Sequence, residues 1–439
     1  MAIVVIFCFL FNSGHFYILA NDIYAHLSLA FLAGLLLVVY GPKKRFFIKS
    51  KIWLQPFMIL SIWIIAVMFL TFEVRIFGSY LRQILVLIVS TLVAINIKFK
   101  TFRYWFVRFM VFVTAVAIVV WIWVNVLSLE LPLPNIKSTW EKTYFPDYKN
   151  GFIVFVYIHM PNKLMGPFWE PGLFATMACY ALLLNTEYDT RSRKSKRRHL
   201  MADILFVVGI LLTLSTAGYI LILIVVLIRY LSVTNKNFAG WQFMLIMLTV
   251  VTLFMFQQQI VTFLSATIPS VFGKLTVNSV SKTTRFNGPL VDLTIFFQHP
   301  VIGTGMQRYL QIWPTYADIL GVESRTSSIT YFIANFGILG LLFPIEIAKG
   351  VMNQKKINWN ARTLLMLLIV LILSKEPHFF NLMSCTLIAY LYNNSNIFVG
   401  RAIEVETLPP APWELPRNDD IENEAEAVTG GNSNFTEGR

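Results

Sequence analysis

Charged residues are scarce in this chain of 439 residues, where they make up 13%, whereas about a quarter of an ordinary globular domain is charged. Hydrophobic residues account for 56%, and the mean hydropathy is +0.65. A soluble fold of this length has too little interior to hide so much apolar surface. The composition therefore argues against a soluble enzyme and indicates a protein embedded in lipid.

Cysteines are few as well, and Cys8, Cys179 and Cys385 all lie in apolar segments. They have neither disulfide nor metal-ligand spacing, and no cluster of His, Cys or paired carboxylates suggests a metal enzyme. We therefore expect buried core thiols, no metal site and no cofactor. No basic residue precedes Lys43, so the start of the chain lacks the charged region of a secretory signal. We expect residues 2–20 to form an uncleaved first helix.

The formal net charge of +13 is unevenly distributed. Residues 401–439 carry a net charge of −6, so the remaining residues carry +19, mostly in short segments between apolar runs. Orientation of membrane helices explains this excess without any nucleic acid. The proline-rich, acidic end at 401–439 predicts a disordered cytoplasmic tail after a membrane domain at 1–400.

A membrane core of about 30 Å is crossed by about 20 apolar residues in a helix. Twelve apolar runs are candidates, near residues 2–20, 25–40, 52–71, 80–97, 105–127, 172–186, 202–214, 218–231, 241–260, 328–348, 363–374 and 379–393. The two runs within 202–231 form either one bent helix or two helices that meet at Ser215–Gly218.

Basic residues decide the predicted orientation, because they concentrate in cytoplasmic loops. With a cytoplasmic N-terminus and twelve spans, five basic clusters face the cytoplasm: Lys43–Lys51, Lys98–Arg108, Arg191–Arg198, Arg229–Lys236 and Lys349–Arg362. We therefore predict an all-α polytopic membrane protein with about 12 transmembrane helices and both termini in the cytoplasm. Its two long extracytoplasmic loops are 128–171 and 261–327.

The first of these loops ends in the string Pro167-Phe168-Trp169-Glu170-Pro171-Gly172. Pro171 suits the first turn of a helix, and Glu170 would lie at its positive dipole end. An ordinary helix start with an interfacial Trp and a capping carboxylate explains the string as well. An ionisable group at the membrane edge is nevertheless a functional candidate.

The second loop carries Arg285 and Arg325, and Arg82 lies at the outer end of the fourth predicted helix. A guanidinium offers a planar fork of donors that matches phosphate oxygens, although each arginine alone could be a solvated or paired loop residue. Arg308 is a further candidate. His299 titrates in the range suited to proton transfer, although a histidine before Pro300 is more often structural.

The glycines that follow, Gly303 and Gly305, form no nucleotide fingerprint and predict a tight turn. A last polar group, Lys375-Glu376-Pro377-His378, interrupts two apolar runs. It forms either a short outer turn with a Lys375–Glu376 pair, or part of a cavity to which Glu376 and His378 contribute.

These strings together resemble the O-antigen and capsule polysaccharide polymerases (Wzy-type), membrane proteins related to the O-antigen ligases. The similarity covers about residues 50–395 and rests on Phe168–Gly172, Leu214–Tyr219, Arg285 with Phe297–Gly305, and Ser327-Ser328 before Phe336–Gly340. The chain departs from the pattern at Thr216-Ala217, where many relatives carry Arg, and at Ser327, where Asn or His is usual.

The resemblance implies a glycosyltransferase of the bacterial inner membrane that joins polyprenyl-diphosphate-linked repeat units into O-antigen, lipopolysaccharide-type or capsule polysaccharide, with inversion. The undecaprenyl-type donor, membrane lipid and a chain-length regulator protein would be its partners. Arg285, Arg325 and Arg82 would hold the diphosphate, and Glu170 or His299 would act as the catalytic base.

Three other functions remain open: an O-antigen ligase with the same donor, a lipid-linked sugar transporter or flippase, and a structural or sensory membrane protein. A transporter would usually show two related halves with the substrate near the middle of the membrane, whereas here the polar residues crowd into the two outer loops.

Overall fold

The computed structural model describes most of residues 1–400 and none of residues 401–439. The described residues are 2–13, 22–40, 55–73, 76–131, 133–137, 147–151, 153–158, 160–185, 193–234, 279–322, 325, 327–375, 381–394 and 397. The predicted span at 241–260 and the predicted disordered tail lie outside them. All the described residues belong to one compact unit, Met1–Gly400.

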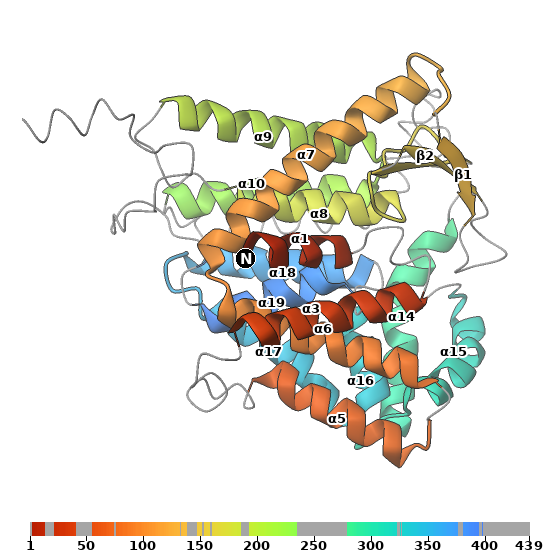
Figure 1. Ribbon diagram of the computed structural model, residues 1–439. Coiled ribbons are helices and arrows are strands. Elements are labelled where there is room, and N and C mark those ends of the chain that lie inside the picture. The colour runs from red at the N-terminus through yellow and green to blue at the C-terminus, as the bar shows by residue number, and fades with distance from the viewer. Residues whose placement is uncertain are drawn as a thin grey trace, which may run out of the picture. The chain divides into compact units, whose positions relative to one another are not determined.

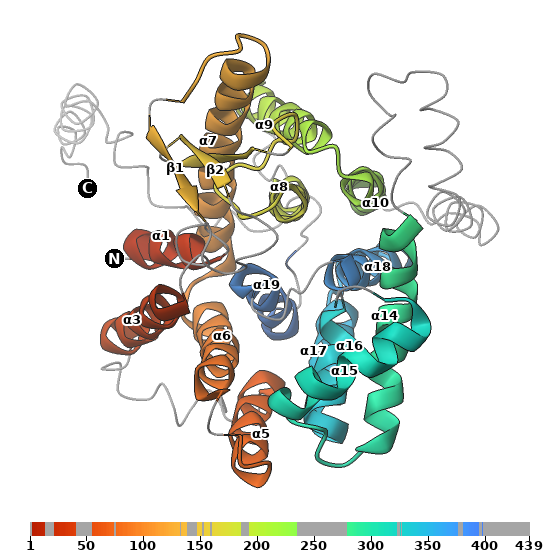
Figure 2. The same cartoon turned by 90° about the vertical axis from the view of Figure 1, so that its right-hand side faces the viewer.

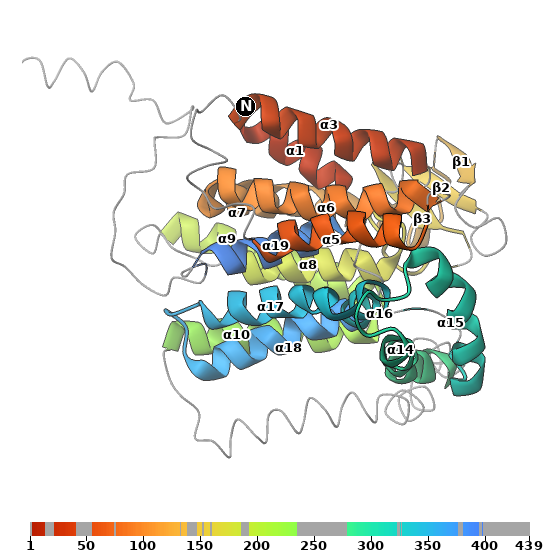
Figure 3. The ribbon, with the colours of Figure 1, turned by 90° about the horizontal axis from the view of Figure 1, so that it is seen from below.

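The first part of this unit is a series of apolar helices. In chain order they are α1 (Ala2–Asn12), α3 (Asp22–Tyr40), α5 (Pro56–Leu70), α6 (Phe77–Asn96) and α7 (Phe99–Asn125). Pro56 begins α5, where its missing N–H leaves no donor unsatisfied. Helices α3 and α5 both pack on α6 (Figure 3). Helix α1 ends at Asn12 and so covers only the first part of the predicted run at 2–20.

A small antiparallel sheet follows α7, within the stretch predicted to be an outer loop. Its strands are β1 (Leu133–Lys137), β2 (Asp147–Gly151) and β3 (Val154–Tyr157), in the order β1-β2-β3. Buried Phe155 and Tyr148 pack with Met165 in a minor core of their own. The fold is thus mainly helical, with this one addition to the predicted all-α class in the described part of the chain.

The next three helices settle the choice left open at 202–231. They are α8 (Pro171–Leu184), α9 (Arg193–Leu212) and α10 (Thr216–Thr234), and both α9 and α10 pack on α8. The turn between α9 and α10 includes Leu214, whose φ of +51° ends the helical path. Residues 202–231 therefore form two helices that lie side by side and not one bent helix (Figure 1).

The last part begins with helices α14 (Ser279–Gln298) and α15 (Met306–Leu320), both with a proline in their interior. An interrupted helix follows: α16 (Ser328–Phe336), the 3₁₀ segment η3 (Gly337–Leu341) and α17 (Leu342–Met352). The described fold ends with α18 (Trp359–Lys375) and α19 (Leu382–Asn393). Helix α19 packs closely against α6, although the two helices are close to three hundred positions apart in the chain (Figure 2).

Three described helical segments are long and apolar enough to cross a membrane: Phe77–Asn96, Phe99–Asn125 and Ser328–Met352. Shorter apolar helices accompany them, at Tyr24–Val39, Pro56–Leu70, Pro171–Leu184, Ala217–Ser232 and Leu382–Asn393. A membrane protein rich in helices is thus consistent with the structure, whereas the number of twelve spans stays a prediction.

Polar side chains inside the helix bundle find partners on neighbouring helices. The Tyr180 hydroxyl of α8 and the Ser384 hydroxyl of α19 are 3.0 Å apart. The Tyr390 hydroxyl donates to the carbonyl of Ile97, at the end of α6, at 2.9 Å. Such bonds add specificity to helix packing, because an apolar surrounding offers no alternative partner. Two predicted core thiols, Cys179 and Cys385, are fully buried, whereas Cys8, which was also expected to be buried, is only partly so.

Candidate functional site

The sheet, α14 and α15 gather at one end of the helices, which we call the sheet end (Figure 1). The first turn of α15 is bound there by the loop between α5 and α6. The Glu73 carboxylate accepts the backbone N–H groups of Gln307 and Arg308 at 2.8 and 2.9 Å. The Tyr80 hydroxyl donates to Glu73 and accepts the backbone N–H of Met306 at 2.8 Å. A carboxylate from a distant loop thus caps α15, where the helix dipole favours negative charge.

The loop of residues 299–305 contains two positions, 303 and 305, at which any residue other than glycine would be strained. Gly303 has φ +85°, and a Cβ there would lie 2.3 Å from the carbonyl oxygen of Asn335. Gly305 has φ +74° and ψ +164°, and its added Cβ would meet the Glu73 carboxylate at 2.8 Å. The predicted tight turn is confirmed, with the Gly303 N–H donating to the carbonyl of His299 at 3.0 Å.

This loop lies against the break between α16 and η3. Backbone N–H groups of Thr304 and Gly305 donate to the carbonyls of Ala334 and Asn335, both at 3.1 Å. Gly337 at the break has φ +63° and ψ −146°, and its added Cβ would lie 2.3 Å from the carbonyl oxygen of Val301. The glycines therefore allow two backbones to touch, which fixes His299 and the first turn of α15 relative to the helix bundle.

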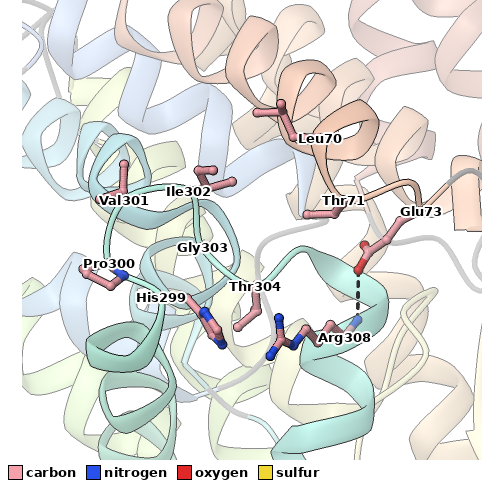
Figure 4. A pocket seen from close by; sticks show the side chains of 10 residues that line it. All are labelled: Leu70, Thr71, Glu73, His299, Pro300, Val301, Ile302, Gly303, Thr304 and Arg308. Atoms are coloured by element: carbon pink, nitrogen blue, oxygen red, sulfur yellow. Dashed lines mark hydrogen bonds between the residues drawn. The ribbon is translucent and has the colours of Figure 1, made fainter.

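A pocket of about 450 Å³ opens beside this loop. Figure 4 shows the side chains of His299 and Arg308 pointing toward the same space, with Thr304 between them. Leu70 and Val301 give the pocket an apolar side, and both are largely exposed. The pocket therefore combines a cationic group, an imidazole, the Glu73 carboxylate that caps α15 and an apolar surface.

The imidazole of His299 is influenced by its surroundings. Partial burial lowers the pKa of His299 below its usual value, and the positive charge of Arg308 lowers it further. Both causes disfavour the imidazolium form. His299 can thus accept a proton at neutral pH, as a general base requires.

A second polar group lies around Asp292 of α14, which is 3% exposed. Its two carboxylate oxygens accept hydrogen bonds from the hydroxyls of Tyr309 and Thr330, each at 2.6 Å. The Arg325 guanidinium carbon is 5.9 Å from the ring centroid of Tyr309. Burial raises the pKa of Asp292 to about 6, whereas the hydroxyl bonds and Arg325 act in the opposite direction.

The structure brings some of the predicted site residues together. Arg308 and His299 share the pocket, and Arg325 lies over Tyr309, the residue that follows Arg308 in α15. Arg82 is buried on α6, beside Gln83, whose side chain lies near the Tyr331 hydroxyl. These residues belong to adjoining parts of the sheet end.

Other predicted residues lie elsewhere or outside the described part. Glu170 precedes α8 with Pro171 at the first helical position, as predicted, and the Lys375 amine donates to the carbonyl of Gly172 in the same turn at 3.0 Å. The backbone of Arg285 lies in α14, but its side chain is outside the described residues, as are Glu376 and His378.

Sequence reasoning missed Glu73 and Asp292. Each is a carboxylate next to or within an apolar run, Met68–Phe72 before Glu73 and Leu290–Phe297 around Asp292. A charge in such a run is costly unless it has a partner, so this signal could have marked both. Their partners come from α15 and α16, which no local pattern indicates.

Comparison with known proteins yields no relative: no protein-family model matches the chain, and no curated protein or solved structure matches it either.

Proposed function

We propose that this protein is a membrane glycosyltransferase that polymerises polyprenyl-diphosphate-linked oligosaccharide repeat units. The observation that supports it is the pocket that Arg308 and His299 share with an apolar side at one end of apolar helices, with Arg325 over the ring of Tyr309, the residue next to Arg308. A lipid-linked diphosphate offers the matching chemistry, because its anionic headgroup lies at the membrane edge next to an apolar chain.

The proposed orientation puts the sheet end outside the bacterial cytoplasmic membrane. The connections between α6 and α7 and between α17 and α18 lie at the opposite end (Figure 1), and they carry basic residues such as Lys98 and Lys355. Positively charged connections favour the cytoplasmic side. Twelve spans, with both termini in the cytoplasm, complete this proposal, and the product would be an O-antigen or capsule-type polysaccharide.

The reaction follows from the groups available. A hydroxyl of the acceptor repeat unit attacks the anomeric carbon of the donor sugar, and a new C–O bond forms with inversion. The bond from that carbon to the diphosphate oxygen breaks, and polyprenyl diphosphate leaves with the electron pair. His299 accepts the hydroxyl proton, while Arg308 and Arg325 stabilise the negative charge on the leaving diphosphate.

Glu170 takes the second role that a transferase needs. It lies at the start of α8, two residues before Gly172, whose carbonyl accepts the Lys375 amine, and next to Trp169, which is half-buried. A carboxylate can hold sugar hydroxyls, and an aromatic ring can pack on a sugar face. We assign Glu170 to the positioning of the acceptor, with proton transfer as its alternative task.

The decisive experiment is reconstitution of the purified protein in liposomes with one defined lipid-linked repeat unit. Polymerisation gives a ladder of longer lipid-linked products, and a chelator should leave the ladder intact because arginines replace a metal ion. We expect Arg325→Ala and Glu170→Gln each to reduce extension at least about tenfold, a loss that corresponds to one charge-assisted hydrogen bond. Arg197→Ala, an exposed arginine of α9, is the matched control.

Gene deletion separates the remaining functions. A polymerase mutant keeps exporting single repeat units and accumulates them as lipid-linked monomers. Accumulation on the cytoplasmic side alone would instead indicate a transporter. Full-length lipid-linked polymer that fails to reach a lipopolysaccharide core would indicate a ligase.

A further inference from the structure

One buried carboxylate ties three helices together at the sheet end. Asp292 belongs to α14, and it accepts hydrogen bonds from Tyr309 of α15 and Thr330 of α16, both at 2.6 Å. The indole of Trp313, one turn after Tyr309, lies close to the same carboxylate. A single side chain therefore connects α14 to both α15 and α16.

Arg325 lies in the connection between those two helices. Gly321 ends α15 in the left-handed conformation, with φ +64°. The Ser327 side chain caps α16 by accepting the backbone N–H of Thr330 at 3.4 Å. Both ends of the connection are thus held, and the guanidinium carbon of Arg325 lies 5.9 Å from the centre of the Tyr309 ring.

Tyr309 contacts both Asp292 and Arg325. Its hydroxyl donates to Asp292, and its ring lies under Arg325 and packs edge-to-face on Tyr331, with ring centres 5.3 Å apart. A ring held at its edge by Tyr331 and at its hydroxyl by Asp292 has little freedom left. The orientation of Arg325 above that ring follows from this arrangement.

Joining helices through a buried carboxylate costs free energy. The carboxylate loses its hydration on burial, and two hydrophobic residues of similar size would join α15 and α16 without that cost. Polar networks of this kind, when satisfied, fix one geometry more narrowly than apolar packing does. The cost is understandable if the geometry of a nearby functional group matters.

We propose that Asp292 is a positioning residue for Arg325: by holding Tyr309 and Thr330 it fixes the guanidinium in the orientation that receives the diphosphate of the lipid-linked substrate. This inference rests on the proposed function, in which Arg325 binds that group. Asp292 touches neither the substrate nor the reacting atoms, so it acts through Tyr309 and Arg325.

Two effects of removing the charge of Asp292 have opposite signs, which makes the proposal testable. Electrostatics alone predicts that Asp292→Asn binds an anionic ligand more tightly, because a negative charge near Arg325 disappears. Positioning predicts weaker binding, because the NH2 group of Asn cannot accept, so the hydroxyl of Tyr309 or Thr330 must turn to accept from it and the present arrangement is disturbed.

The experiment measures binding of geranyl diphosphate, a short prenyl diphosphate, to the full-length protein in nanodiscs. We expect Asp292→Asn and Tyr309→Phe to bind about tenfold more weakly, the loss typical of one charge-assisted hydrogen bond. The apparent Tm of Asp292→Asn should be equal to or above that of the wild type, so that unfolding does not explain the loss. Asp318→Asn, an exposed carboxylate of α15, should bind as the wild type does.

Unchanged or tighter binding by Asp292→Asn would overturn the inference. A further measurement separates this from failure of the proposed function. If Arg325→Ala abolishes binding while Asp292→Asn does not weaken it, only the positioning role is wrong. If Arg325→Ala binds normally, Arg325 does not hold the diphosphate and both proposals fail at this residue. In the ladder assay, positioning should raise KM for the donor more than it lowers kcat.

Discussion

Replacement of Gly337 by alanine tests the contact between the 299–305 loop and the helix break. At φ +63° and ψ −146°, Gly337 has a conformation that is essentially restricted to glycine and costs other residues about 1–3 kcal/mol. The new Cβ would also lie 2.3 Å from the carbonyl oxygen of Val301 and 2.7 Å from the backbone nitrogen of Gly303. These are backbone atoms and cannot turn away as a flexible side chain would.

The magnitude follows from adding the two effects. Forced overpacking typically costs about 1–3 kcal/mol, so the variant should lose about 4 kcal/mol in total. The hydrogen bond from the Ile338 N–H to the Val301 carbonyl, 3.3 Å long, would also be disturbed. Gly34→Ala is the matched control, because nothing lies within 4 Å of its added Cβ in the exposed face of α3. Replacing an exposed helical glycine by alanine should raise the stability of the protein by about 0.5–1 kcal/mol.

The assay uses the thiols of the core. Cys179 and Cys385 are fully buried, so a fluorogenic maleimide reacts with them only as the protein unfolds in detergent on heating. The half-buried Cys8 should be replaced by Ser in every variant to remove background. Apparent Tm values are compared at one scan rate, since unfolding is expected to be irreversible.

We expect Gly337→Ala to lower the apparent Tm by about 5 °C or more, whereas Gly34→Ala leaves it unchanged or raises it. A Gly337→Ala variant as stable as the wild type would refute the close backbone contact. A Gly34→Ala variant that is strongly destabilised would show that general intolerance of larger residues, and not the special conformation of Gly337, explains the result.

Three further predictions concern charged side chains, and the same thermal assay measures them. Glu73→Ala should cost about 2 kcal/mol, because it uncaps α15, and an equal Tm would contradict the cap. The stability of Asp292→Asn relative to the wild type should increase as pH rises. The raised pKa of Asp292 stabilises the wild-type fold below pH about 4, and this stabilisation is lost as pH rises through about 6. The full loss is about 3 kcal/mol, and about half of it falls between pH 5 and 8. A pH-independent difference would contradict this. Arg229→Met should cost about 1.5 kcal/mol, since Arg229 pairs with Asp203 at 2.8 Å and donates to the Asn185 carbonyl at the end of α8, and Lys355→Met is the exposed control that should cost nothing.

The apolar runs of the sequence predicted most helices of the structure, because a segment of about 20 apolar residues has few alternatives in lipid. Pro171 marked the start of α8, and Gly303 with Gly305 marked a tight turn, since each residue type restricts the backbone locally. The sheet at 133–157 was not predicted, because its short strands lack a long alternating pattern.

Composition and the order of apolar and polar segments by themselves determined a mainly helical class whose apolar helices suit a membrane protein. They drew attention to Arg285, Arg325, Arg82, Glu170 and His299 as candidates, with Arg308 as a further one. Only the tertiary structure decided which of these lie together, because that depends on contacts between segments more than two hundred residues apart, such as Glu73 with the first turn of α15. A carboxylate in an apolar run signals that a partner exists. Which backbone or hydroxyl group that partner is, as for Asp292 with Tyr309 and Thr330, follows only from how the helices pack.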